Sequence, residues 1–307
     1  MSWKTIFQQR DSIQLLMISC CLAITSFSQI PSAGEQIMQD VKGIEGKDHV
    51  GREEFVKGAL KKLGVNFLAM PFDTILSGRN GKKDTLRGEN IIVRMGNGKS
   101  RIVVGAHYDA VPGAPGANDN GGGVGVILEL VAAFNNKPLH HTIDFCFFDR
   151  EEDGLIGSAV YVQRHEPSVH HLAMINLDVE GTGDELYVGP VGGGDDNLIM
   201  RYVHAARDST KFPYEENEIY PDADNESFAA AHMENISISV VVKGDVEKIV
   251  AWAKSGYPQF KNPEDVPVVL KVMHTPQDVS ALMTPEALNM SYQFTKSIIT
   301  LLDAGEP

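Results

Sequence analysis

Residues 101–134 read RIVVGAHYDAVPGAPGANDNGGGVGVILELVAAF, and this stretch carries the strongest information about the fold. Positions 101–106 form a nearly continuous apolar run, which is typical of a strand buried on both faces of a parallel sheet. A loop rich in Gly and Pro follows over 111–123, and residues 124–134 are apolar enough for a buried helix. Because the next apolar run, 142–148, reads as another buried strand, the stretch predicts a strand–helix–strand unit.

The alternation of strands and helices extends along the chain on both sides of this unit. Apolar spacing predicts further helices over 48–63, 158–165, 196–207 and 285–302, and further strands over 66–72, 90–95, 172–177 and 236–242. This order predicts an α/β fold with a mixed, mostly parallel central β-sheet flanked by helices. No convincing linker follows residue 45, so we expect a single domain from 46 to 307.

A turn signal stands between two of the predicted strands. Residues 96–99 read GNGK, and Asn-Gly between apolar runs is typical of a tight hairpin turn. We therefore expect the strand over 90–95 to pair directly with the strand over 101–106.

The N-terminus has the composition of a targeting segment. Lys4 and Arg10 precede an uncharged stretch whose apolar core, 13–27, is shorter than the roughly 20 residues that a membrane-spanning helix needs. The pattern predicts a secretory signal peptide over 1–28, followed by an N-terminal segment over 29–45. The mature chain would then be exported to the periplasm or the exterior, without membrane insertion after the signal is cleaved.

Two alternatives stay open for this targeting segment. Residues 17–20 read MISC and loosely resemble a lipoprotein signal, in which case Cys20 would carry a lipid anchor. An uncleaved anchor is the other alternative. Since Cys20 and Cys21 lie inside the signal, Cys146 is the one cysteine of the mature chain, and its apolar surroundings predict a buried core residue.

The charge balance argues against two classes of partner. The chain has 27 Lys and Arg residues against 41 Asp and Glu residues, a formal net charge of −14. Nucleic-acid binding usually needs a basic face, and docking on anionic lipid needs basic clusters. We therefore expect neither partner, whereas an acidic surplus can include carboxylates that hold cations.

Acidic and histidine side chains recur just after the predicted strands or in the loops beside them. They stand in five segments: residues 107–109, 115–121, 148–154, 176–181 and 273–278. In open α/β sheets the ligand site lies beyond the carboxyl ends of the strands, so we expect these segments to meet. A His with an Asp two residues later suits a metal-binding imidazole that a carboxylate orients. Of the adjacent carboxylates Glu151 and Glu152, one can ligate a metal while the other handles a proton.

Taken together, the five segments resemble the co-catalytic zinc exopeptidases of metallopeptidase family 28. The matching stretches read GAHYD (105–109), GANDN (116–120), FFDREEDG (147–154), NLD (176–178) and HTPQD (274–278). They occur in this order, and the resemblance extends over roughly residues 91–307. It implies a zinc-exopeptidase fold of the phosphorylase/hydrolase-like class.

The resemblance also implies a centre of two zinc ions per chain. Its ligands would be Asp119 as the bridge, His107 and Asp178 on one ion, and Glu152 and His274 on the other. In the same pattern Glu151 would be the general base, and Asp109 would orient His107 from outside the ligand set. In members of this family the peptide bond after the bridging Asp is often cis, so Asp119–Asn120 is expected to be cis.

The chain departs from the family pattern at one important position. Residues 222–228 read DADNESF and align with a family segment usually written Ser-Asp-His-x-x-Phe, so that Asp224 and Phe228 match. Asn225 replaces the usual His, which in the family is thought to face the tetrahedral oxyanion. An Asn amide still donates hydrogen bonds, so Asp224 and Asn225 are candidate substrate and oxyanion residues.

These features predict an exported zinc aminopeptidase, a hydrolase that removes N-terminal residues from peptide substrates, with Glu151 as base on a zinc-bound water. A glutaminyl-peptide cyclotransferase with one zinc is the alternative within the same fold, although Met273 stands where cyclases tend to carry Trp. A catalytically inactive binding ectodomain is the third reading, and the intact set of ligand residues argues against it.

Overall fold

The computed structural model describes residues 31–77, 83–166, 168–191 and 198–305. The predicted signal peptide over 1–28, with Cys20, lies outside the described residues, as does the first part of the predicted helix over 196–207. Within the described ranges, no helix combines the length and the apolar character needed to cross a membrane.

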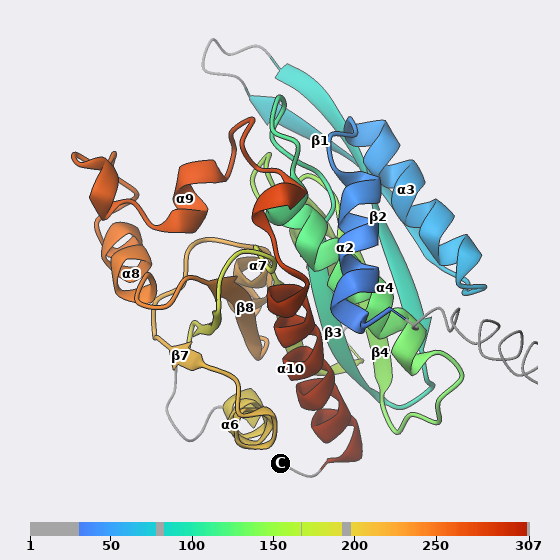
Figure 1. Cartoon of the computed structure of the whole chain (residues 1–307). Helices are drawn as coiled ribbons and strands as arrows, with labels where there is room; N and C mark the ends of the chain where they lie inside the picture. The colour runs from blue at the N-terminus through green and yellow to red at the C-terminus, as the bar shows by residue number, and fades with distance from the viewer. Residues whose placement is uncertain (1–30, 78–82, 167, 192–197, 306–307) are drawn as a thin grey trace, which may run out of the picture. The chain divides into compact units, whose positions relative to one another are not determined.

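An eight-stranded sheet runs through the middle of the fold (Figure 1), in the order β1-β2-β4-β3-β5-β8-β6-β7. The four strands β4, β3, β5 and β8 are mutually parallel, whereas β1, β2 and β6 join the sheet through antiparallel pairs. The strands are β1 (Leu68–Ser77), β2 (Lys83–Met95), β3 (Ser100–His107), β4 (Thr142–Phe148), β5 (His170–Leu177), β6 (Glu185–Gly189), β7 (Tyr214–Glu216) and β8 (Asn235–Val241). The predicted mixed, mostly parallel sheet is confirmed.

Helices cover both faces of this sheet. On one face α2, α4 and α10 lie side by side (Figure 1), and on the other α5 and α7 pack against a smaller apolar cluster. The helices are α2 (Ala33–Ile44), α3 (His49–Lys62), α4 (Gly123–Phe134), α5 (Ile156–Gln163), α6 (Leu198–Thr210), α7 (Asn225–Ala230), α8 (Val246–Lys254), α9 (Val268–Val272) and α10 (Pro285–Ala304). The mostly apolar residues 268–272, which precede His274, form the short helix α9.

The central strand β3 shows why its sequence is apolar without interruption. Ile102 and Val104 point into the larger core with α4 and α10, whereas Val103 points into the smaller core with α5 and α7. Since successive side chains of a strand point to opposite faces, a strand covered on both faces needs apolar residues at both parities. Cys146, on the neighbouring β4, is buried in the smaller core as predicted.

The predicted hairpin at residues 96–99 is wrong. Strand β4 lies between β2 and β3, so the two predicted partners do not pair. The glycines are needed instead because two backbone segments pass close to each other here. A Cβ at Gly96 would lie 2.3 Å from the His141 carbonyl oxygen, and a Cβ at Gly98 would lie 2.2 Å from the His140 carbonyl oxygen. The loop passes directly over the backbone that enters β4, and the Thr142 hydroxyl donates to the Gly98 carbonyl at 2.8 Å.

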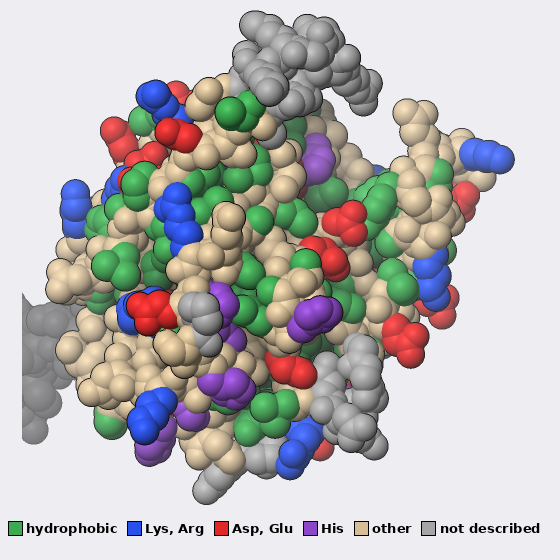
Figure 2. All heavy atoms as spheres, turned by 180° about the vertical axis from the view of Figure 1, so that it is seen from behind, with side chains coloured by type: hydrophobic (Ala, Val, Ile, Leu, Met, Phe, Trp, Pro, Cys, Tyr) green, Lys and Arg blue, Asp and Glu red, His purple; other side chains and the backbone are tan. Residues whose placement is uncertain are grey.

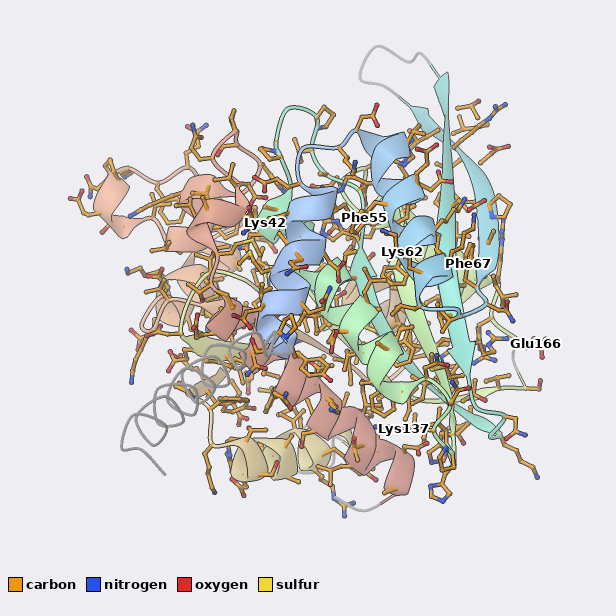
Figure 3. All side chains as sticks on the ribbon, turned by 45° about the vertical axis from the view of Figure 1, so that its right-hand side comes forward. Lys42, Phe55, Lys62, Phe67, Lys137 and Glu166 are labelled. Atoms are coloured by element: carbon orange, nitrogen blue, oxygen red, sulfur yellow. The ribbon has the colours of Figure 1, made fainter. Side chains whose placement is uncertain are left out.

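The first two helices brace the larger core. Ser32 is the N-cap of helix α2, and its hydroxyl and the Glu35 carboxylate form a reciprocal capping box. The apolar face of α2 packs against α4 and α10. Figure 3 shows α2 and α3 with Phe55 of α3 between them, and that ring lies against Gly43, where a Cβ would be 2.4 Å from the nearest ring carbon. Helix α3 is thereby held over the loops that follow β3.

The carboxylate of Asp40, on α2, predicts that the stability of the fold depends on pH. Burial, with the nearby Glu129, raises the pKa of Asp40 to about 6. The folded chain then binds this proton more tightly than the unfolded chain, so the stability contributed by Asp40 falls as pH rises from about 4 to about 6. We expect Asp40→Asn to raise the free energy of unfolding at pH 7 by at most about 3 kcal/mol, and by much less at pH 4.

Urea unfolding at the two pH values measures this effect. Asp208→Asn, at an exposed position on α6, is the matched control, because Asp208 pairs with Arg207 and gains nothing from being neutral. An equal gain for Asp40→Asn at pH 4 and pH 7 would contradict the assignment.

Candidate metal centre

The candidate site lies at the carboxyl edge of the parallel strands. From β3 the chain crosses through α4 to β4 on one side, and from β4 it crosses through α5 to β5 on the other side of β3. Such a change of direction opens a crevice beyond the strand ends, where ligands bind in α/β folds. His107 ends β3, Glu151 and Glu152 follow β4, and Asp178 follows β5.

The Gly-rich loop brings Asp119 to the same edge. Residues Ala117–Gly122 form a wide helical turn at the start of α4, and the Asp119–Asn120 peptide bond is cis, as expected. The amides of Asn118 and Asp119 donate to the Asp278 carboxylate at 2.8 and 3.1 Å, and the Asn120 side chain donates to the Leu177 carbonyl at 2.8 Å. These buried bonds fix the turn between β5 and the C-terminal segment.

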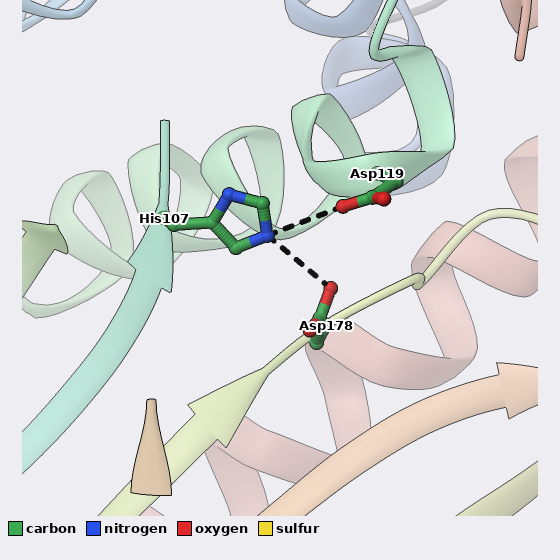
Figure 4. A group of neighbouring side chains, drawn as sticks. All are labelled: His107, Asp119 and Asp178. Atoms are coloured by element: carbon green, nitrogen blue, oxygen red, sulfur yellow. Dashed lines mark ion pairs between the residues drawn. The ribbon is translucent and has the colours of Figure 1, made fainter. Parts of the chain in front are cut away.

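The five predicted ligands are brought together around Asp119. His107 Nε2 lies 3.2 Å from Asp119 Oδ1 and 3.6 Å from Asp178 Oδ1 (Figure 4). On the other side, His274 Nε2 lies 3.0 Å from Asp119 Oδ2 and 3.1 Å from Glu152 Oε2. The two oxygens of Asp119 therefore face two different histidines, which is the arrangement that a bridging carboxylate requires.

Electrostatics and burial both fit this cluster to cations. Burial works against a charged His107, yet the surrounding carboxylates, Glu151 foremost, raise its pKa well above the usual range. Bonds from Asp119 and Glu152 raise the pKa of His274 to about 10. Glu152 Oε1 and Asp178 Oδ1 are buried without a hydrogen-bond donor in the described part of the chain. Oxygens in that state, beside imidazoles, suit divalent metal ions that accept N and O ligands.

Asp109 supports more of the site than the sequence suggested. One of its oxygens lies 3.5 Å from Nδ1 of His107, the side chain that it is predicted to orient. Its two oxygens also accept the backbone N–H groups of Glu151 and Glu152, at 3.1 and 3.2 Å. Asp109 thus holds the end of β3 and the turn after β4 at a fixed separation.

Glu151 lies beside the predicted ligands. Its Oε2 is 4.0 Å from His107 Nε2, and it lines a cavity together with Asp119, Glu152 and His274. Burial raises the pKa of Glu151 well above its usual range, with Asp224 and Asp178 adding to the rise. A bound cation would oppose this effect, because it stabilises the ionised carboxylate.

The two candidate oxyanion residues, Asp224 and Asn225, do not join the cluster of predicted ligands. The Asn225 amide donates to Asn235 Oδ1 at 3.0 Å and accepts from the Ser237 hydroxyl at 2.8 Å, so its groups are used in the interior. Asp224 is buried, neither of its oxygens has a hydrogen-bond donor among the described residues, and burial raises its pKa to about 7. The structure does not bring Asn225 to the cavity wall.

A cavity of about 510 Å³ opens onto Asp119, Glu151, Glu152, Asp178 and His274. Its other walls are mainly apolar and come from the chain after β5, from β6, β8 and α8, and from the chain around α9: Val179, Tyr187, Val241, Ile249, Trp252 and Met273. Figure 2 shows a face of the molecule on which acidic side chains lie next to apolar ones. Most Lys and Arg side chains on this face lie toward its margins. None of the described residues that line the cavity is Lys or Arg.

Tyr220 is a wall residue that the sequence reasoning missed. Its hydroxyl is hydrogen-bonded to the Ser239 hydroxyl, and burial raises its pKa well above the usual range, so it stays a proton donor. Its position shortly before residues 222–228 was the available signal, since that segment was already aligned with a family motif.

The comparisons with known proteins assign the chain to a family. The family described as Peptidase family M28 matches residues 90–296. The chain therefore belongs to peptidase family M28.

Curated relatives share shorter segments. Aminopeptidase YwaD of Bacillus subtilis is 37% identical over 117 residues, which are 36% of this chain and 26% of that protein. Probable lipoprotein aminopeptidase LpqL of Mycobacterium tuberculosis is 43% identical over 82 residues, 26% of this chain and 16% of that protein. The chain thus covers about a quarter or less of the length of these relatives.

Solved structures share the whole fold. The zinc aminopeptidase BSAP from Bacillus subtilis has a TM-score of 0.71 at 15% identity, with 89% of this chain and 96% of that chain covered. A glutaminyl cyclase from Porphyromonas gingivalis has a TM-score of 0.65 at 20% identity, with 88% and 97% covered. At these identities the likeness establishes the fold, which both proteins share with this chain.

Proposed function

We propose that the chain is an exported zinc aminopeptidase with two zinc ions, which hydrolyses the first peptide bond of its substrates. The observation that carries the proposal is the carboxylate of Asp119, whose two oxygens face His107 and His274 separately. One zinc would be held by His107 and Asp178, the other by Glu152 and His274, and both by Asp119. Imidazole and carboxylate are ligands that zinc takes in catalytic sites.

Bound zinc would supply Lewis-acid polarisation of the scissile carbonyl and of the attacking water. Glu151 is the general base in this proposal: its carboxylate accepts a proton from the water and returns it to the leaving amine. The Tyr220 hydroxyl lines the same cavity and donates its proton to Ser239 Oγ, because the Ser239 hydroxyl donates to the Asp178 carbonyl. Asp109 keeps Glu151 and the ligands in register through the backbone N–H groups.

The charge of the cavity favours the free N-terminus of a peptide. Five carboxylates line it, those of Asp119, Glu151, Glu152, Asp178 and Asp222, and its described lining includes no Lys or Arg. Two zinc ions would offset four of these five negative charges. Asp222, which is not a proposed ligand, would then be the carboxylate left to attract a protonated α-amino group and to repel a C-terminal carboxylate. This argument supports aminopeptidase over carboxypeptidase specificity.

The apolar part of the cavity supports a preference for a large apolar N-terminal residue. We expect Trp252→Ala to raise KM for phenylalanyl anilide about tenfold and to change KM for alanyl anilide little, because the indole forms part of the cavity wall. Steady-state kinetics on the two anilides measure the difference. A similar loss for both substrates would contradict a side-chain-binding role for Trp252.

Export is proposed on the signal-like N-terminus, and the relative named as a lipoprotein aminopeptidase supports it. Mass spectrometry of the protein purified from its native membrane and soluble fractions distinguishes cleavage after residue 28 from a lipidated Cys20.

Zinc content and turnover together test the activity. Purified chain is assayed on aminoacyl anilides, N-blocked peptides and peptides that begin with Gln. Two zinc ions per chain with release only from free N-termini is the expected result. One zinc with pyroglutamate formation would replace the proposal with the glutaminyl cyclase that one structural relative exemplifies. No bound metal and no turnover after zinc is added would leave a binding domain.

A further inference from the structure

Arg52 is an unusual buried cation beneath the site. It lies on α3, outside residues 90–296 that match the family, and only 1% of its surface is exposed. Its guanidinium donates to three backbone carbonyls: Nε to Tyr108, Nη1 to Pro115 at 3.3 Å, and Nη2 to Gly116 at 3.1 Å. A planar fork of donors that ends on carbonyl oxygens fixes backbone positions in two dimensions.

The three carbonyls belong to the two ends of one loop. Tyr108 directly follows His107, and Gly116 directly precedes the turn that carries Asp119. Gly116 has a φ of 65°, and a Cβ there would lie 2.8 Å from Arg52 Nη1, so the guanidinium approaches the loop backbone closely at this glycine. One side chain thereby links the backbone beside His107 to the backbone beside Asp119.

The same helix also contacts the turn after β4. His49, one helical turn before Arg52, lies with Nε2 2.8 Å from Asp149 Oδ1, and Asp149 is fully buried two residues before Glu151. Helix α3 therefore touches each of the backbone segments that present His107, Asp119 and Glu151.

We propose that Arg52 is a positioning residue for the metal centre: it sets the separation of His107 and Asp119 by holding the loop between them. The inference rests on the proposed function, because it assigns Arg52 to the zinc centre of that function. Two consequences of losing Arg52 oppose each other. Loss of the fork lets the ligands drift and weakens zinc binding, whereas loss of a positive charge near Asp109, Asp119 and Glu152 strengthens it.

Because the two effects change zinc affinity in opposite directions, a measurement of zinc affinity distinguishes them. Arg52→Lys keeps the charge and loses the fork, and Arg52→Met loses both. We expect each variant to bind zinc about tenfold more weakly or worse, measured by competition with a chromogenic chelator on the full chain. Unchanged affinity in Arg52→Lys with tighter binding in Arg52→Met would overturn the proposal, since charge alone would then explain Arg52.

Controls separate positioning from general destabilisation. Lys57→Met removes another cation of α3, one that pairs with Glu53 and Glu89, and should leave zinc affinity unchanged. Adding millimolar guanidinium should restore zinc affinity in Arg52→Ala and do nothing for the wild type; no restoration would contradict the fork. If Arg52→Met fails to fold, Arg52→Lys carries the test. Wild type that binds zinc without cleaving peptides would remove the proposed function and leave this inference standing.

Discussion

Replacing Glu151 by Gln is expected to lower kcat on an aminoacyl anilide about a thousandfold while two zinc ions per chain remain bound. The amide has the shape of the carboxylate but cannot accept a proton from water. Its backbone N–H still donates to Asp109, so the turn after β4 keeps its position. Turnover and zinc content measured on the same sample give both halves of the result.

The neighbouring position provides the matched comparison. The Glu152 carboxylate lies 3.1 Å from His274 Nε2 and is a proposed ligand, so Glu152→Gln should lose zinc as well as activity. Glu234→Gln, at an exposed position before β8, controls for the same exchange outside the centre. Equal zinc loss in Glu151→Gln and Glu152→Gln would show that base and ligand are misassigned.

The parts of the fold that sequence predicted well are those with local signals. Strand β4 occupies residues 142–148 as expected, because a strand buried on both faces is a short apolar run between polar ends. Helix α10 begins at Pro285 as expected, since Pro is favoured in the first turn and the Thr284 side chain caps the helix. The candidate ligands follow from the same logic, because they stand where strands end.

The parts that were missed depend on contacts between distant segments. The Asn-Gly turn at 96–99 has local hairpin chemistry, yet β4 enters between the two strands from 40 or more residues away. Ser32 and Glu35 carry the capping-box signal of helix α2, but they stand in the predicted N-terminal segment over 29–45, for which no helix was predicted. The cavity walls from α8 and α9 carry no motif.

Contacts of individual polar groups were the least predictable. The alignment gave Asn225 an oxyanion role, whereas its amide is bonded to Asn235 and Ser237 on β8. An amide has several donors and acceptors, and which partners they find depends on the packing of two elements rather than on neighbouring residues. Arg52 is an example in which the sequence contains no signal at all. Nothing near it in the sequence indicates that its guanidinium donates to three backbone carbonyls some 60 residues away.

The second large effect is expected at Asp119. Asp119→Asn should weaken both zinc sites, by more than the roughly tenfold to hundredfold that loss of an outer partner of a metal ligand costs. The carboxylate has one oxygen toward His107 and the other toward His274, whereas an amide offers one oxygen and an NH₂ group that repels a cation. The backbone N–H of Asp119 still donates to Asp278, so the turn has its anchor.

Variants of single-site ligands give the contrast that decides whether Asp119 bridges. His274→Gln should remove the ion shared with Glu152 and leave the ion held by His107 and Asp178; Asp178→Asn should do the reverse. Zinc titration of the three variants by chelator competition measures how many ions each one loses. Loss of one ion in His274→Gln and of both in Asp119→Asn follows only if the two oxygens of Asp119 serve different ions. Loss of a single ion in Asp119→Asn would assign Asp119 to one site alone, and its proposed bridging role would be overturned.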